Sequence, residues 1–134
     1  MKRIRVLIAD DHVDFRRVVH EFLDKLPEVA VVGEACDGIE AVQKVEALAP
    51  DVVLMDIAMP RSSGLEATRI IKQRWPSTRV LIATMHDNPL YRIQALEAKA
   101  DGFVVKTSLK LSLERELRAP GTERSRVVSY PPQP

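Results

Sequence analysis

Acidic side chains stand at the ends of two apolar segments of the sequence. Asp10 and Asp11 follow the segment Ile4–Ala9, and Asp56 follows the apolar run 52–55. Carboxylates at the carboxyl ends of parallel strands lie where open α/β sheets bind their ligands. Three carboxylates, with no histidine or cysteine in line with them, favour a hard divalent cation such as Mg²⁺. A carboxylate beside such an ion can also accept a phosphoryl group as an acyl phosphate.

Two more polar residues end apolar segments in the same way, Thr84 after 79–83 and Lys106 after 102–105. Mg²⁺ and one ammonium group together balance the charge of three carboxylates, which would otherwise repel one another. Phosphoryl transfer depends mainly on positioning and charge neutralisation. We therefore predict that Asp56 is the nucleophile, that Asp10 and Asp11 hold the metal, and that Lys106 and Thr84 contact phosphoryl oxygens.

Five strand-like segments alternate with five helical ones. The predicted strands are Ile4–Ala9, 29–34, 52–55, Arg79–Thr84 and 102–106, and the helices begin near residues 12, 38, 64, 89 and 108. This alternation predicts an α/β fold, a doubly wound five-stranded parallel sheet between two helical layers, with the flavodoxin-like strand order 2-1-3-4-5. Because the first and third strands are then neighbours, about 4.8 Å apart, the three acids converge.

Smaller expectations follow from the same patterns. Asp11 or His12 would cap the first helix, His20 would lie on its surface, and Ile93 and Leu96 would face inward from the fourth helix. The single cysteine, Cys36, is expected to be a small buried apolar residue, and it excludes a disulfide framework.

The composition excludes several classes of protein. The chain has 134 residues, 46% of them hydrophobic, and a net charge of +1. That length predicts one folded domain at 1–118, followed by a flexible polar and proline-rich tail at 119–134. The near-neutral charge gives no argument for nucleic-acid or membrane binding, and without a signal peptide or a membrane span the expected location is the cytoplasm.

These residues resemble the receiver domain of bacterial two-component response regulators. The resemblance covers residues 3 to about 118 and rests on five features: Asp10-Asp11; Asp56 with Met59-Pro60 and Gly64; Thr84; Phe103; and Lys106. The segments 83–87 and 100–106 are most similar to the NarL/LuxR-like subfamily, whose full-length members carry a helix-turn-helix DNA-binding domain and regulate transcription. The order 2-1-3-4-5 is that of flavodoxin and of such receivers.

The resemblance implies that a sensor histidine kinase, or a phosphotransfer protein, phosphorylates Asp56. It implies Mg²⁺ bound by Asp11, Asp56 and the Ala58 carbonyl, with Asp10 acting partly through water. Thr84 and Phe103 would form a switch pair, in which Phe103 acts by packing because it has no hydroxyl group.

Further expectations concern turnover and assembly. Ala58 and His86, each two residues after a site residue, would modulate dephosphorylation. A homodimer formed on phosphorylation is also compatible with the family. The domain would be no enzyme beyond its own phosphoryl transfer and slow dephosphorylation.

Two departures from the family pattern stand out. Lys99 occupies a position where a glycine usually ends the fourth helix, and the fifth helix is halted by Pro120-Gly121 with no helix-turn-helix sequence after it. We therefore expect no output domain and no direct DNA contact in this chain, which is compatible with a stand-alone receiver or with part of a longer regulator.

Two other functions share the fold. A metal-dependent phosphatase of the haloacid-dehalogenase kind would need a second acid two residues after its nucleophile, and Ala58 stands there. An interaction module that works without phosphorylation is the second alternative. A nucleotide site is disfavoured, because neither a Gly-x-Gly-x-x-Gly motif nor a P-loop occurs.

Overall fold

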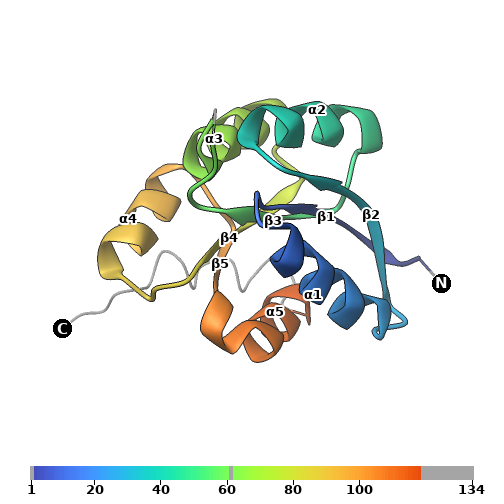
Figure 1. Cartoon of the computed structure of the whole chain (residues 1–134). Coiled ribbons are helices and arrows are strands. Elements are labelled where there is room, and N and C mark those ends of the chain that lie inside the picture. Colours follow the sequence, from blue (N-terminus) through green and yellow to red (C-terminus); the bar gives the residue numbers. More distant parts are fainter. Residues whose placement is uncertain (1, 61, 119–134) are drawn as a thin grey trace.

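The computed structural model describes residues 2–60 and 62–118, which fold as alternating strands and helices (Figure 1). The strands are β1 (Ile4–Ala9), β2 (Val29–Ala35), β3 (Val52–Asp56), β4 (Arg79–Thr84) and β5 (Gly102–Val105). The helices are α1 (Val13–Asp24), α2 (Gly38–Leu48), α3 (Gly64–Arg74), α4 (Pro89–Glu97) and α5 (Leu109–Arg118), and a short 3₁₀ turn, η1 (Lys106–Ser108), precedes α5. The tail predicted at 119–134 lies outside the described residues.

All strand pairs are parallel, and the order is β2-β1-β3-β4-β5, as predicted. The middle strand, β3, is buried along its whole length, which explains why it reads as an unbroken apolar run until Asp56. Its neighbours β1 and β4 end level with it, since Ala9 pairs with Met55 and Ala83 pairs with Asp56. The polar residues that end these strands therefore lie side by side at the carboxyl end of the sheet.

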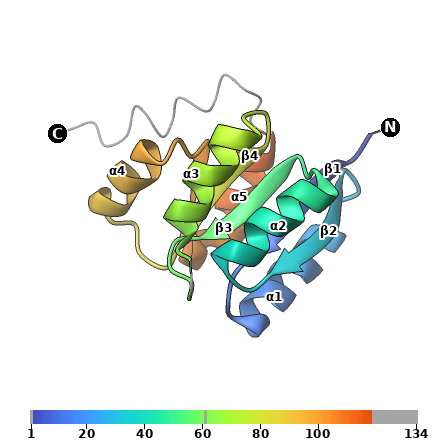
Figure 2. The ribbon, with the colours of Figure 1, turned by 90° about the horizontal axis from the view of Figure 1, so that it is seen from above.

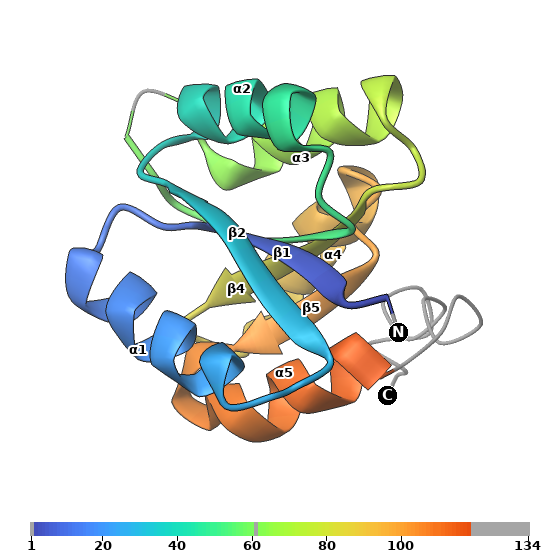
Figure 3. The same ribbon diagram turned by 90° about the vertical axis from the view of Figure 1, so that its right-hand side faces the viewer.

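Helices cover both faces of the sheet (Figures 2 and 3). On one face α2, α3 and α4 enclose a core that includes Val45, Ile71 and Ala95, and on the other α1 and α5 enclose one that includes Leu23 and Leu113. The three-layer sandwich expected from the sequence is confirmed. Within the described part of the chain, none of the helices has the length and apolar character needed to cross a membrane.

The helix ends have local causes in the sequence. Asp37 and Ser63 accept hydrogen bonds from the first turns of α2 and α3, and Asn88 does the same for α4, whose first residue is a proline. After α4, Lys99 adopts a φ of 72°, the left-handed conformation for which a glycine is favoured. The departure noted in the sequence is thus a backbone position that a lysine occupies at a cost.

Four local predictions were wrong. β5 ends at Val105, because Lys106 already belongs to the 3₁₀ turn. His12 is the N-cap residue of α1, but neither its side chain nor that of Asp11 makes a capping hydrogen bond. Cys36 is exposed, because it lies beyond the end of the edge strand β2. Ile93 is 43% exposed, since α4 packs on the core through Ala95 instead.

Candidate functional site

The loop after β1 and the last residue of β3 bring four side chains together. Asp10, Asp11, His12 and Asp56 each offer one ligand atom, and these atoms all lie within 4.8 Å of one another. Asp10 and Asp56 are 1% and 5% exposed, whereas Asp11 and His12 face solvent. The convergence expected from the strand order is therefore observed, and half of the cluster is buried.

Lys106 reaches this cluster from the end of β5. Its Nζ donates a hydrogen bond of 2.6 Å to Asp10 Oδ2 and lies 3.3 Å from Asp56 Oδ1. The ammonium group also lies 4.2 Å from the centroid of the Phe15 ring on α1. One buried cation thus bridges two buried carboxylates, so loss of that cation would leave both without a counter-charge.

The bridge does not fully compensate the burial of Asp56. Burial, and then the negative charge of Asp10, raise the pKa of Asp56 to about 6, although the Lys106 ammonium group acts in the opposite direction. Without a further positive charge, the ionised form of Asp56 is therefore electrostatically unfavourable. A divalent cation or another positive group nearby would stabilise it.

His12 was not expected in this cluster. Its Nδ1 lies 3.0 Å from Asp10 Oδ1 and 3.3 Å from Asp11 Oδ1, and its backbone N–H donates to Asp10 Oδ1 at 2.9 Å. The hydrogen bond with Asp10 raises the pKa of His12, and the charge of Asp11 adds to the effect. The available signal was its place in the sequence directly after two acids.

The loop after Asp56 depends on a glycine. A Cβ added at Gly64 would lie 1.8 Å from the backbone oxygen of Asp56, so this position accepts no side chain without a backbone shift. The Gly64 N–H donates to the Ile57 oxygen at 3.1 Å, which closes the turn beneath Asp56, while Ala58 is exposed within it. The glycine singled out in the sequence therefore fixes the backbone of the acid.

Thr84 and Phe103 lie on adjacent strands beside the acids. Thr84 is 3% exposed, and its Oγ1 accepts a hydrogen bond from the backbone N–H of His86, whose side chain is exposed. Phe103 is 6% exposed and packs in the core beneath α4, where the Arg92 guanidinium group lies 4.4 Å from its ring centroid. Thr84 and Phe103 are both buried, and the contact of Phe103 with Arg92 was not foreseen.

The donor set fits a hard divalent cation. Asp10, Asp11 and Asp56 form an acidic pocket of carboxylate oxygens that could bind a metal ion. Asp10 Oδ2 is already bonded to Lys106, which leaves Asp11 and Asp56 as the acids with the freer oxygens.

The geometry agrees with the comparison of the chain with known families. Residues 6–118 match the response regulator receiver domain. The chain belongs to this family. Its sheet order and its five helices match those of solved receiver domains, so the receiver fold and the role of a receiver in two-component response regulators follow for these residues.

Individual relatives of this receiver have different outputs. It is 43% identical over 104 residues to the transcriptional regulatory protein DegU of Brevibacillus brevis, a match that covers 78% of this chain and 44% of the relative. It is 40% identical over 119 residues to a protein-glutamate methylesterase/protein-glutamine glutaminase of Pyrococcus abyssi, covering 87% of this chain and 32% of the relative. The chain thus covers less than half of the length of each of these two relatives.

Solved receiver-domain structures superpose well on this chain. The signal receiver domain of the NarL response regulator from Mycobacterium tuberculosis superposes with a TM-score of 0.82 at 36% identity, covering 87% of this chain and 94% of that one. The response regulator domain of Thermotoga maritima CheB gives a TM-score of 0.75 at 36% identity, covering 98% and 100%. Both transcriptional and methylesterase relatives therefore share this receiver fold.

Proposed function

We propose that this receiver accepts a phosphoryl group on Asp56 from a sensor histidine kinase or a phosphotransfer protein, with Mg²⁺ as cofactor, and thereby changes a protein-interaction surface. The observation that carries the proposal is the Lys106 ammonium group between Asp10 and Asp56, beside an acid whose pKa burial has raised to about 6. A structural salt bridge would need one carboxylate, whereas this cluster places four ligand atoms within 4.8 Å.

The step forms one bond and breaks another. An Asp56 carboxylate oxygen attacks the phosphorus atom, the new P–O bond forms, and the phosphorus–nitrogen bond of the donor phosphohistidine breaks, so that the imidazole leaves with the electron pair. Mg²⁺ would be held by Asp11, Asp56 and the Ala58 carbonyl, with Asp10 acting partly through water. The bound ion would neutralise negative charge on the phosphoryl oxygens. Lys106 is already 3.3 Å from Asp56 and pairs with a phosphoryl oxygen as a point charge.

The remaining residues act around that step. The Thr84 hydroxyl group accepts a hydrogen bond from the His86 N–H at 3.4 Å. On phosphorylation it turns away from that group and donates a hydrogen bond to a phosphoryl oxygen. Its movement leaves space that the Phe103 ring can enter, so the signal passes to the surface of α4 by packing. The exposed Ala58 and His86 flank the path of a hydrolytic water and modulate the loss of the phosphoryl group.

The biological setting completes the proposal. The receiver acts in the cytoplasm and serves transcriptional regulation, and it dimerises on phosphorylation. Residues 1–118 form the phosphoacceptor unit, whose partner is the kinase or phosphotransfer protein and neither nucleic acid nor membrane. Its chemistry is limited to its own phosphoryl transfer and slow dephosphorylation, not the turnover of an enzyme.

The test is phosphorylation by acetyl phosphate, a small acyl-phosphate donor, followed by intact mass. We expect a gain of one phosphoryl group that requires Mg²⁺, that is absent in Asp56→Asn and that persists in Asp14→Asn, a change at a side chain that is 91% exposed. No gain under any condition would overturn the proposal in favour of a phosphorylation-independent module. Repeated release of phosphate from an ester would favour the phosphatase.

A further inference from the structure

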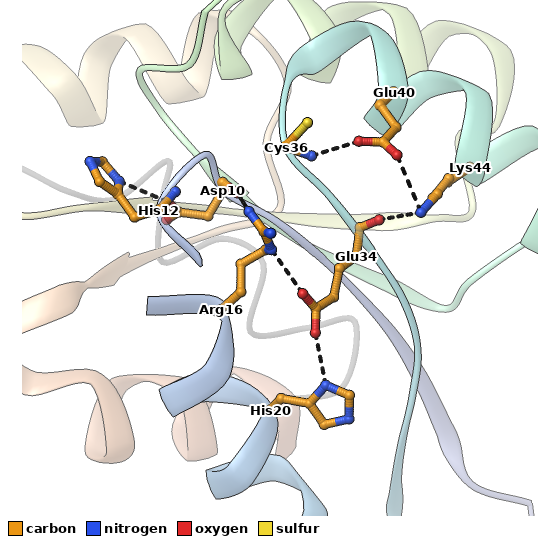
Figure 4. A network of polar contacts seen from close by, with 8 residues as sticks. All are labelled: Asp10, His12, Arg16, His20, Glu34, Cys36, Glu40 and Lys44. Carbon is orange, nitrogen blue, oxygen red and sulfur yellow. Dashed lines mark hydrogen bonds and ion pairs between the residues drawn. The ribbon is translucent and has the colours of Figure 1, made fainter. Parts of the chain in front are cut away.

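The carboxylate of Glu34, at the end of β2, is held by two side chains of α1 (Figure 4). Arg16 Nε donates to Glu34 Oε1 at 2.8 Å, and His20 Nδ1 lies 2.9 Å from Oε2. The hydrogen bond with His20, and then that with Arg16, lower the pKa of Glu34 against the opposing effect of burial. Glu34 is therefore an ionised and doubly bonded partner for Arg16.

The other end of the Arg16 guanidinium group reaches the candidate site. Arg16 Nη1 donates a 2.6 Å hydrogen bond to the backbone oxygen of Asp10 (Figure 4). The Asp10 N–H donates to the Ala35 oxygen at 2.9 Å. Both backbone polar groups of Asp10 are thus held by α1 and β2. Because its side chain is only 16% exposed, Arg16 makes these bonds largely out of solvent, where they are stronger.

The backbone of Glu34 is held from the opposite face of the sheet. Lys44 on α2 donates to the backbone oxygen of Glu34 at 2.5 Å, and its Nζ lies 3.3 Å from Glu40 Oε2. Glu34 also pairs in register with Ile8 of β1. The end of β2 that contacts Arg16 is therefore held from both faces of the sheet, and Arg16 in turn is bonded to the backbone oxygen of Asp10.

We propose that Arg16 is a positioning residue for Asp10, oriented by Glu34 and His20, and that this network sets the affinity of the acidic pocket for its divalent cation. The inference rests on the proposed function, because it concerns the metal of that same site. Partners that orient a metal ligand typically contribute 10–100-fold to affinity. A rotation of the Asp10 peptide would displace the carboxylate that Lys106 and the cation share.

The charge of Arg16 makes the prediction distinctive. A cation close to a metal site repels the metal, so a purely electrostatic role predicts tighter binding when Arg16 is neutralised and no change when it becomes lysine. The positioning role predicts weaker binding in both variants, since a lysine ammonium is a point charge that does not reproduce the planar fork between Asp10 and Glu34. The two roles therefore predict opposite changes in affinity for Arg16→Met, and only the positioning role predicts a loss for Arg16→Lys.

The experiment measures Mn²⁺ affinity, using the loss of the free-ion electron paramagnetic resonance signal, for the full chain. The variants are Arg16→Met, Arg16→Lys and Glu34→Gln, and Arg17→Ala is the matched control, because Arg17 lies next to Arg16 on the same helix with a side chain that is 66% exposed. We expect affinity about tenfold weaker in Arg16→Met and Arg16→Lys, about threefold weaker in Glu34→Gln, and unchanged in Arg17→Ala. Circular dichroism in EDTA at the same temperature establishes that each variant is folded.

Each outcome decides a different point. If the wild-type chain binds no Mn²⁺, the proposed function fails. If the wild-type chain binds it and Arg16→Met binds equally well or more tightly, only the positioning role is overturned. If Arg16→Met is unfolded, Arg16→Lys and Glu34→Gln carry the test, and wild-type affinity in both would overturn the inference. Losses in Arg16→Met and Glu34→Gln that do not add in the double variant would show that the two residues act as one unit.

Discussion

The Lys106 ammonium group is the shared partner of two acids that have little access to solvent. It bonds to Asp10 at 2.6 Å and lies 3.3 Å from Asp56, and its own side chain is 6% exposed. Removing the one cation that two buried carboxylates share leaves both of them uncompensated, which is costly. The same residue therefore governs both folding stability and the proposed chemistry.

Lys106→Met should lower the free energy of unfolding by about 2–4 kcal/mol in the absence of divalent cations, because two buried carboxylates lose their counter-charge. Urea unfolding in EDTA measures the change. Lys110→Met is the control, since Lys110 is exposed on α5. Equal stability of Lys106→Met and the wild-type chain would contradict the bridging geometry.

Asp56→Asn should stabilise the metal-free protein at neutral pH and not at acidic pH. The pKa of Asp56 rises from 3.8 to about 6 on folding, so its protonation favours the folded state below pH 4, and that stability is lost as the pH rises through 6. An asparagine has no charge to bury, so the variant should gain about 2 kcal/mol over the wild-type chain at pH 7.5. Urea unfolding in EDTA at pH 4.5 and 7.5 gives the comparison, and a gain equal at both values would refute the argument.

The connection after α4 stores backbone strain, because Lys99 adopts a φ of 72°. Lys99→Gly should stabilise the fold by about 0.5–1 kcal/mol. The substitution removes the steric cost of a Cβ in the left-handed conformation, and the greater conformational entropy of glycine in the unfolded chain offsets part of that gain. Thermal unfolding measures it. Lys25→Gly should instead destabilise, since Lys25 ends α1 with a φ of −82°. Destabilisation by both changes would show that the Lys99 side chain makes a contact worth more than the strain.

Element positions were predictable where burial is complete, and less so elsewhere. β3 is buried on both faces, so its apolar run and the acid after it identify the strand and the site together. The end of β2 lies at a sheet edge, where periodicity carries little information, and Cys36 was misplaced there. His12, just before α1, and Arg16, in its first turn, were missed as site residues, because their contacts with Asp10 are set by side-chain direction, which apolar spacing does not encode.

For the molecule as a whole, a bound divalent cation should add to the stability of the fold by mass action. At a hundredfold excess over the dissociation constant, Mg²⁺ should contribute about 2.7 kcal/mol, which corresponds to a rise in Tm of about 10 °C for a domain of this size. EDTA should abolish the rise. Lowering the pH to 5 should reduce it, because Asp56, with its pKa of about 6, then binds a proton instead.

Asp56→Asn is the control for this shift, since an asparagine side chain has nearly the same shape as aspartate and removes the charge of one ligand. Differential scanning fluorimetry with Mg²⁺ and with K⁺ at equal ionic strength separates specific binding from screening. A shift as large in Asp56→Asn as in the wild-type chain would place the ion elsewhere.

The hydrogen bond from Lys106 to Asp10 spans 96 positions of the sequence. Asp56 and both preceding acids leave the ribosome well before Lys106, so a partly synthesised chain carries the acceptor without its counter-charge. Contacts of such long range form late, after the intervening chain has collapsed. Under the proposed function, phosphoryl uptake by Asp56 would therefore require that Lys106, which directly follows β5, has reached the acidic pocket.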